Sequence, residues 1–291
     1  MKLTVNIKEV ESYLTKSNVP ASDYAINPYV GCPHGCKYCY ACFMNRFTGH
    51  TEEWGSFVDV KISKKPIAVK KLVNKSVSMA TVTDCYNPAE KQYKITRNIL
   101  EQLVDVPCHL NIITRSSLVL RDIDLLKRCK NVEVAISINT LDEQFKRDMD
   151  HADSIKNRIR TLKELHENGI YTILFMSPIF PEITNFREII EQTRDFVNEY
   201  WFENLNLRGS FKAKILSYIG QNYPDLKDLY DDIYSDRRSN KSYWDALSIN
   251  IEDYCSKNNI RHTNYFYHAE LVASKKTSDT VRKYSQHRIF P

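Results

Sequence analysis

The stretch NPYVGCPHGCKYCYACF, residues 27–43, holds four of the eight cysteines in this chain of 291 residues. Cys32, Cys36 and Cys39 have the spacing C-x3-C-x2-C, and Cys42 follows them. Thiolates are the soft ligands that iron-sulfur clusters take. Three thiolates leave one iron of a four-iron cluster without a protein ligand, so that iron can bind a further molecule.

Two other interpretations of these cysteines stay open from the residues alone. A structural zinc ion needs four ligands, usually as two separated pairs, and Cys42 could complete a set only on the same crowded loop. The cysteines could also be packing residues. Pro33 and Gly35 let the chain wrap closely round a cluster, and Tyr38 gives aromatic cover beside Cys39. We therefore favour an iron-sulfur cluster.

Short β-rich runs alternate with helical patterns from about residue 57 to residue 207. The expected strands are FVDVKI, SMATV, HLNIIT, VEVAISI, YTILFM and NLNL, residues 57–62, 78–82, 109–114, 132–138, 171–176 and 204–207. The helical faces between them are Ile95, Ile99, Leu100 and Leu103, then Ile159, Leu162 and Leu165 before Gly169. Such alternation predicts parallel strands with right-handed crossovers. Because six units are fewer than the eight of a closed barrel, we expect an α/β fold, a partial (β/α)6 barrel with its active site at the carboxyl ends of the strands.

The sequence changes character after residue 210. It is typical of helices, with Trp244, Leu247, Ile251 and Tyr254 on one face, followed by the aromatic run NYFYHAELV at residues 264–272. We expect residues 1–210 to form the barrel core with the cysteine loop. Residues 211–291 are expected to form a mostly helical extension that packs on the same domain.

Charge and hydropathy indicate a soluble, cytoplasmic protein with no membrane partner. No apolar run approaches the roughly 18 to 20 residues that cross a bilayer, and the N-terminus lacks the apolar stretch of a secretory signal.

The net charge of +5 is uneven, because Lys61 to Lys75 carries six lysines and no acid, and residues 274–291 are also basic. Such runs suit a polyanion, although they also occur on solvated surfaces that bind nothing.

Several segments resemble a known family in their order and spacing. They are NPYVGCPHGCKYCYA, TVTDCYNPAEKQYKITRNILE, NIITRSSLVLRDIDLL, VAISINTLDE and FMSPIFPEITN. Together they resemble the radical S-adenosylmethionine (radical SAM) superfamily, in the branch of spore photoproduct lyase, over about residues 25–185. The resemblance implies that Cys32, Cys36 and Cys39 bind a 4Fe-4S cluster whose open iron chelates S-adenosylmethionine. An electron from a donor such as flavodoxin or ferredoxin would then release a 5'-deoxyadenosyl radical, which abstracts hydrogen from a substrate.

The resemblance also implies contacts to S-adenosylmethionine. Tyr38 matches an aromatic residue at the adenine. Thr83 and Asp84 match the pair that holds the methionine amino group, and Glu90 is a second acid nearby. Arg115 matches a basic residue that meets the methionine carboxylate. For Glu90 the alternative is an acid that only favours the start of a helix.

Two further contacts follow from the same resemblance. Ser137 matches a hydroxyl that bonds the ribose, and Asn139 beside it could do the same. Ser177 lies where the backbone receives the adenine. The alternative for both serines is a residue at the end of a strand whose hydroxyl bonds its own backbone.

One position departs from spore photoproduct lyase. That enzyme has a hydrogen-donating cysteine directly before the polar and acidic pair, where this chain has Val82. Cys85 follows Asp84 and is a candidate hydrogen donor or radical relay, unless it is a small buried residue. We expect the scattered cysteines, Cys108, Cys129 and Cys255, to pack in the core.

Two classes of function are consistent with these patterns. The first is a radical SAM enzyme that acts on nucleic acid, a peptide or a small molecule; Tyr265, Phe266, Tyr267 and His268 could stack on bases. The second is a non-enzymatic iron-sulfur protein that senses redox state or assists a partner. Only the first needs a pocket for S-adenosylmethionine, so Asp84, Arg115 and Ser137 discriminate between them.

Overall fold

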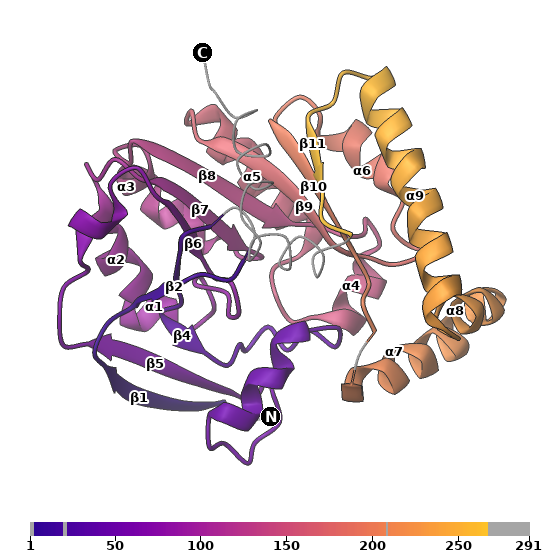
Figure 1. Cartoon of the computed structure of the whole chain (residues 1–291), viewed down its shortest axis with the longest axis horizontal. Helices are drawn as coiled ribbons and strands as arrows, with labels where there is room; N and C mark the ends of the chain where they lie inside the picture. Colours follow the sequence, from indigo (N-terminus) through magenta and orange to yellow (C-terminus); the bar gives the residue numbers. More distant parts are fainter. Residues whose placement is uncertain (1–2, 20–21, 208, 267–291) are drawn as a thin grey trace.

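The computed structural model describes residues 3–19, 22–207 and 209–266. Within these residues, the main sheet has eight strands in the order β11-β10-β9-β8-β7-β6-β3-β2 (Figure 1). Its strands are β2 (Leu14–Lys16), β3 (Tyr24–Ile26), β6 (Ser76–Met79), β7 (His109–Thr114), β8 (Asn131–Ser137), β9 (Tyr171–Ile179), β10 (Glu199–Asn204) and β11 (His262–Asn264). All neighbours are parallel except β2 and β3. Because β2 and β11 are separate edges, the sheet is open, and the predicted α/β fold of partial-barrel type is confirmed.

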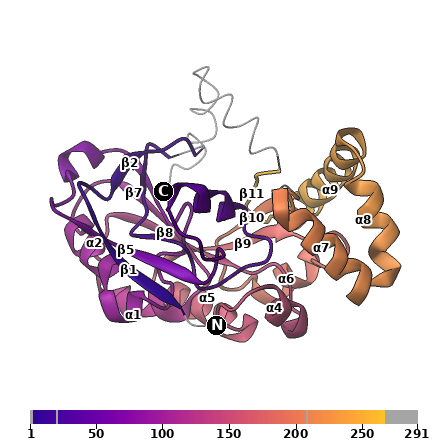
Figure 2. The ribbon, with the colours of Figure 1, turned by 90° about the horizontal axis from the view of Figure 1, so that it is seen from below.

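Helices follow the parallel strands as the crossovers require. They are α1 (Glu90–Tyr93), α2 (Ile95–Leu103), α3 (Ile123–Leu126), α4 (Glu143–Met149), α5 (Ile155–Glu167) and α6 (Phe186–Thr193), with 3-10 turns η1 (Tyr40–Phe47), η2 (Val69–Leu72) and η3 (Ser117–Asp122). Figure 2 shows α1, α4, α5 and α6 along one side of the sheet. Leu162 and Leu165 of α5 are fully buried, as the helical pattern predicts.

One of the six predicted strands is misplaced, and another belongs to a different sheet than expected. The run FVDVKI forms β5 (Phe57–Ser63), which belongs to a separate small sheet with β1 (Thr4–Val10) and β4 (Tyr29–Val30). The first parallel strand of the main sheet is β3, upstream of the cysteine loop. Residues 205–207 follow β10 and are not a strand. Strands such as β10 are buried on both faces, so they lack the alternation that marks a strand in sequence.

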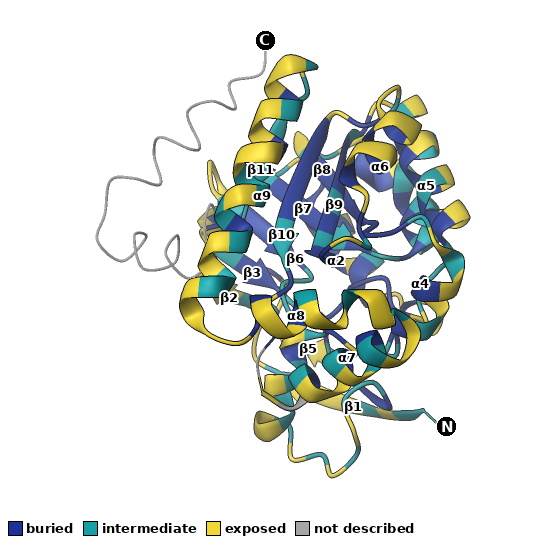
Figure 3. Cartoon of the chain, turned by 90° about the vertical axis from the view of Figure 1, so that its right-hand side faces the viewer, coloured by how far each residue is buried: buried dark blue, intermediate teal, exposed yellow. Residues whose placement is uncertain are grey.

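The C-terminal region is mostly helical, as predicted, and its apolar residues join the main core. It contains α7 (Gly209–Asn222), η4 (Pro224–Leu226), α8 (Lys227–Ile233) and α9 (Arg237–Lys257). Ile219, Tyr230, Trp244 and Ile251 are buried in the same apolar cluster as the sheet residues. Figure 3 shows mainly buried strands in the centre and exposed outer sides on α7 and α9.

Strand β11, which pairs with β10, was not predicted. The predicted stacking residues Tyr267 and His268 and the basic stretch 274–291 lie outside the described residues. None of the described helices is long and apolar enough to cross a membrane.

Candidate active site

A cavity of about 1560 Å³ lies inside the open barrel. It is bordered by the cysteine loop, by the inner faces of β6 to β10, and by residues at the start of α7 and α9. The interior of a closed barrel of this kind is normally filled by layers of side chains. Here the interior is a space large enough for both a cofactor and a substrate.

The cysteine loop is wound tightly at the edge of this cavity. The Gly35 N-H donates to the Cys32 carbonyl at 3.1 Å, and the Cys39 N-H donates to the Cys36 carbonyl at 3.1 Å. Gly35 has a φ of +56°, and a Cβ there would lie 3.2 Å from the His151 ring. The backbone therefore needs glycine at this position. As a result Cys32, Cys36 and Cys39 all line the cavity.

The thiols of this loop are spaced for ligation of separate irons. Among the described residues, no three His, Cys, Asp or Glu side chains converge on a single point. Each thiolate of an iron-sulfur cluster instead binds a different iron. Burial raises the pKa of Cys32 and Cys39, and it raises the pKa of Cys36 to about 12. Ligation of metal would therefore release protons from this loop.

Asp84 is fixed at the end of β6 by three donors. Its carboxylate accepts from the Thr114 hydroxyl at 2.7 Å, the Arg115 N-H at 2.7 Å and the Tyr86 N-H at 2.9 Å. A carboxylate has about four acceptor positions. Asp84 also lines the cavity, so one acceptor position is left for a ligand such as an ammonium group.

Three polar side chains around Asp84 have buried atoms without a partner. Thr83 Oγ1, Arg115 Nε and Ser137 Oγ are buried and make no hydrogen bond to any described residue, and all three residues line the cavity. Buried polar atoms are nearly always paired in native proteins. These atoms come from three consecutive strand ends and fit a polar ligand that carries amino, carboxylate and hydroxyl groups, as S-adenosylmethionine does.

Tyr38 and Ser177 also line the cavity. The Tyr38 hydroxyl donates to Asp150 at 3.1 Å, which fixes the ring with its face toward Arg115, 5.8 Å from the guanidinium carbon. Burial raises the pKa of Tyr38, so the phenol stays neutral. The Ser177 hydroxyl donates to Glu203, and the Ser177 carbonyl accepts from Arg115 Nη2 at 3.0 Å.

Glu90 lies away from the cavity, so we correct its assignment. It is completely buried and does not line the cavity. Its carboxylate accepts from the Tyr29 hydroxyl, the Thr96 N-H at 2.9 Å and Arg121 Nη2 at 2.6 Å. These partners tie α1 to the start of α2. Glu90 therefore has a structural role and is removed from the set of S-adenosylmethionine contacts.

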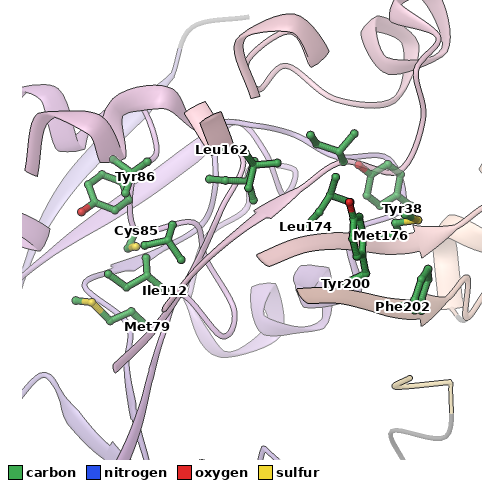
Figure 4. Close-up of a cluster of buried hydrophobic side chains, with 14 of the residues drawn as sticks. Tyr38, Met79, Cys85, Tyr86, Ile112, Leu162, Leu174, Met176, Tyr200 and Phe202 are labelled. Carbon is green, nitrogen blue, oxygen red and sulfur yellow. The ribbon is translucent and has the colours of Figure 1, made fainter. Parts of the chain in front are cut away.

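Asn139 and Cys85 are corrected for the same reason. The Asn139 amide donates to the Pro178 carbonyl at 3.0 Å, and Asn139 does not line the cavity. Cys85 is completely buried among apolar residues including Met79, Ile112 and Tyr86 (Figure 4). Although Cys85 follows Asp84, it lies in the core and offers no thiol to the cavity.

His34 is a cavity residue that the sequence reasoning missed. It lies between Cys32 and Cys36 and is 4% exposed, and neither ring nitrogen makes a hydrogen bond within the described part of the chain. Its Nε2 is 3.8 Å from Asp84, yet burial keeps the pKa of His34 below its ordinary value. The position of a histidine inside the cysteine motif was a signal that could have identified it.

Cys42 also lines the cavity.

The chain belongs to the radical SAM superfamily. The sequence model of that superfamily matches residues 26–197. An uncharacterized protein of Methanocaldococcus jannaschii is 40% identical over 240 residues, which cover 82% of this chain and 90% of that protein. A protein named radical SAM Nalpha-GlyT isomerase, of Pseudomonas phage M6, is 29% identical over 169 residues, which cover 56% of this chain and 34% of that protein.

Solved structures show the same fold. Spore photoproduct lyase complexed with a dinucleoside spore photoproduct has a TM-score of 0.55 at 16% identity, over 76% of this chain and 66% of that chain. SuiB of Streptococcus suis bound to S-adenosylmethionine has a TM-score of 0.51 at 15% identity, over 82% of this chain and 49% of that chain. The match to the superfamily's sequence model confirms the predicted family, which uses a 4Fe-4S cluster and S-adenosylmethionine.

Proposed function

We propose that this protein cleaves S-adenosylmethionine and abstracts a hydrogen atom from a substrate held in the barrel cavity. When bound on Cys32, Cys36 and Cys39, the reduced cluster supplies the electron that splits the sulfonium into methionine and a 5'-deoxyadenosyl radical. The single observation that carries the proposal is that Thr83 and Ser137 point buried, unpartnered hydroxyls into the cavity that the three cysteines line.

In this proposal, the strand ends hold S-adenosylmethionine by complementary charge. Asp84 accepts from the amino group, with Thr83 beside it, and Arg115 donates to the carboxylate. Ser137 bonds the ribose, whereas Tyr38 and the backbone near Ser177 receive the adenine. A non-enzymatic iron-sulfur protein would have no need for these polar groups around the cavity.

Nucleic acid is the substrate class that we propose. Arg46, Arg237 and Lys241 line the cavity together with the aromatic residues Phe43 and Tyr265. Cations and aromatic rings in one groove are how single strands are commonly bound. The lysine run 61–75 does not line the cavity. We therefore base the proposal on the cavity rim and not on that run.

Anaerobic turnover tests the reaction. Reconstituted protein is reduced with dithionite, or with a flavodoxin or ferredoxin as the proposed natural donor, and 5'-deoxyadenosine is quantified after addition of S-adenosylmethionine. We expect product from the wild type and none from Cys36→Ala. Absence of product from wild-type protein with a full iron content would contradict the proposal.

Filter binding tests the substrate class. Single-stranded DNA and RNA are titrated at several salt concentrations, and we expect affinity to fall steeply as salt rises. No binding even at low salt would exclude nucleic acid as the substrate.

A further inference from the structure

We propose that the barrel floor recognises a planar nitrogen heterocycle with N-H donors on its edge, such as a nucleobase that carries an amino group. The barrel floor is defined as the inward side chains Ser78, Asn111 and Glu133. This inference rests on the proposed function, because it assigns the part of the same cavity that holds the substrate.

The sheet register makes the barrel floor a single row. Ser78 of β6 is the register partner of Asn111 of β7, and Asn111 is the partner of Glu133 of β8. All three side chains are more than nine-tenths buried and line the cavity. Barrel interiors at this depth are usually filled by branched apolar residues. The hydrogen bond between Asn111 and Glu133 lowers the cost of burying this row, and a ligand that pairs with the remaining polar atoms would lower it further.

The hydrogen bonds within the row set which atoms are presented. The Asn111 amide donates to Glu133 Oε1 at 2.9 Å, and His109 Nε2 lies 3.2 Å from Glu133 Oε2. This orientation uses the amide nitrogen of Asn111, and its carbonyl oxygen accepts nothing from the described residues. The Ser78 hydroxyl makes no hydrogen bond with the described residues either. The row therefore presents mainly acceptors: a carboxylate, an amide carbonyl and a hydroxyl.

An aromatic wall lies on the other strands of the same cavity. Phe175 of β9, Trp201 of β10 and Tyr265 are in mutual edge contact, with ring centroids 5.5 to 6.3 Å apart. All three line the cavity and belong to a small apolar cluster that is distinct from the main core. Aromatic walls favour planar ligands, which they hold by stacking.

The spacing along the strands connects this site to the reaction. Glu133 and Ser137 are four residues apart on β8, and Asn111 and Arg115 are four apart at β7. At about 3.3 Å per residue, the floor lies roughly 13 Å below the proposed S-adenosylmethionine contacts. A base anchored on the floor would therefore extend toward the reacting end of the cavity.

The barrel floor and the aromatic wall together select the chemical class of the ligand. An apolar side chain would leave the Asn111 carbonyl and the Ser78 hydroxyl unpaired. A compact cation could contact an aromatic face, but it has no flat ring to stack on the aromatic wall. Guanine and cytosine both present amino N-H donors that match a row of acceptors, and Glu or Asp accepting from the cytosine amino group is an established pairing. Thymine presents one ring N-H between two carbonyls, and a carboxylate repels those carbonyls.

Equilibrium dialysis of the reconstituted protein tests this assignment, with S-adenosylmethionine present and no reductant. The probes are guanosine, cytidine, thymidine and guanidinium. We expect guanosine and cytidine to bind at least tenfold more tightly than thymidine. Equal binding of thymidine, or guanidinium binding as tight as guanosine, would overturn the inference.

Variants assign any preference to the barrel floor. Glu133→Gln is expected to abolish the preference over thymidine, whereas the matched control Glu167→Gln, on the exposed face of α5, retains it. If Glu133→Gln does not fold, as judged by circular dichroism, Ser78→Ala is the smaller change and should weaken guanosine binding several-fold. A preference that survives in a folded Glu133→Gln protein, or unchanged guanosine binding by Ser78→Ala, would overturn the inference.

Two further arms identify the source of the base and separate this inference from the proposed function. If a single-stranded dC octamer binds at least tenfold more tightly than cytidine, the base belongs to nucleic acid; if not, a free nucleoside is the ligand. Both results support the floor assignment. A nucleoside preference in a protein that forms no 5'-deoxyadenosine would support the assignment of the floor and refute the proposed function. Formation of 5'-deoxyadenosine by a protein without any nucleoside preference would support the proposed function and refute the assignment of the floor.

Discussion

The two ends of the barrel cavity use polar residues in different ways. At the carboxyl ends of the strands, which form the upper end of the cavity, Thr83 and Ser137 have buried hydroxyls with no partner among the described residues. On the barrel floor, Asn111 and Glu133 bond to each other. The hydroxyls at the upper end need a ligand to complete their hydrogen bonds. The bond between Asn111 and Glu133 instead orients the acceptors of the floor before any ligand binds. The difference suggests that the upper end serves the chemistry of the superfamily and that the floor serves the substrate of this chain.

Loss of one cluster ligand should have the largest effect on the upper end. We predict that Cys39→Ala loses the cluster and forms no 5'-deoxyadenosine, because three thiolates are needed. The matched control is Cys42→Ala, which we expect to keep the cluster although Cys42 lines the same cavity. Iron and sulfide analysis after reconstitution measures both. A cluster that survives Cys39→Ala and is lost in Cys42→Ala would reverse the assignment.

Substitutions of the two acids in the TVTDCYNPAE segment, Asp84 and Glu90, should affect different properties of the protein. Glu90→Gln removes the charge of a completely buried carboxylate that is paired with the partly exposed Arg121, and it should lower the free energy of unfolding by about 3 kcal/mol. Asp84→Asn should instead weaken S-adenosylmethionine affinity more than tenfold. Urea denaturation and equilibrium dialysis measure the two effects. Weak S-adenosylmethionine binding by a folded Glu90→Gln protein would restore Glu90 as a ligand.

Removal of one unpartnered hydroxyl is a finer test of the upper end. Ser137→Ala should leave the stability of the ligand-free protein unchanged, because Ser137 Oγ makes no hydrogen bond there. It should weaken S-adenosylmethionine binding about fivefold, which corresponds to roughly 1 kcal/mol for one hydrogen bond. Dialysis and thermal unfolding measure both. Unchanged affinity would show that Ser137 does not touch the ligand.

The smallest expected effect lies outside the cavity, at His50. His50 Nε2 is 2.9 Å from Asp59 and Nδ1 is 3.1 Å from Glu52. Burial alone would lower the pKa of His50, but these two acids raise it above its ordinary value. The stabilisation is therefore complete below the unfolded pKa of about 6.5 and is lost as pH rises through the folded pKa.

Thermal unfolding of the wild type and of His50→Gln measures this effect. We expect the difference in Tm to be larger at pH 6 than at pH 8.5. S-adenosylmethionine affinity should not change, because His50 does not line the cavity. A difference in Tm that grows with pH would contradict the assigned ion pairs.

The upper end could be predicted from sequence because its residues lie in short motifs. The cysteine loop and the ends of β6, β7, β8 and β9 each carry a local pattern, and these segments meet because parallel strands end at one edge. Glu90 and Cys85 were assigned wrongly because they are near Asp84 in sequence. Their side chains face α2 and the core, and only the fold shows this.

The barrel floor could not be predicted in this way. Ser78, Asn111 and Glu133 come from three separate strands and have no shared motif, so they meet only through the strand register. Strand β10 was misplaced for a related reason, because burial on both faces removes the alternation of polar and apolar residues. The expected six strands include FVDVKI, which belongs to the small sheet, and NLNL, which lies just after β10.

The most direct test of the central claim is the electron paramagnetic resonance spectrum of the reduced cluster, recorded with and without S-adenosylmethionine. If the three-cysteine loop and the polar strand ends form one site, addition of S-adenosylmethionine should change the spectrum of the wild type. Asp84→Asn should need a higher concentration for the same change. A spectrum that S-adenosylmethionine leaves unchanged, in wild-type protein with a full iron content, would contradict the account.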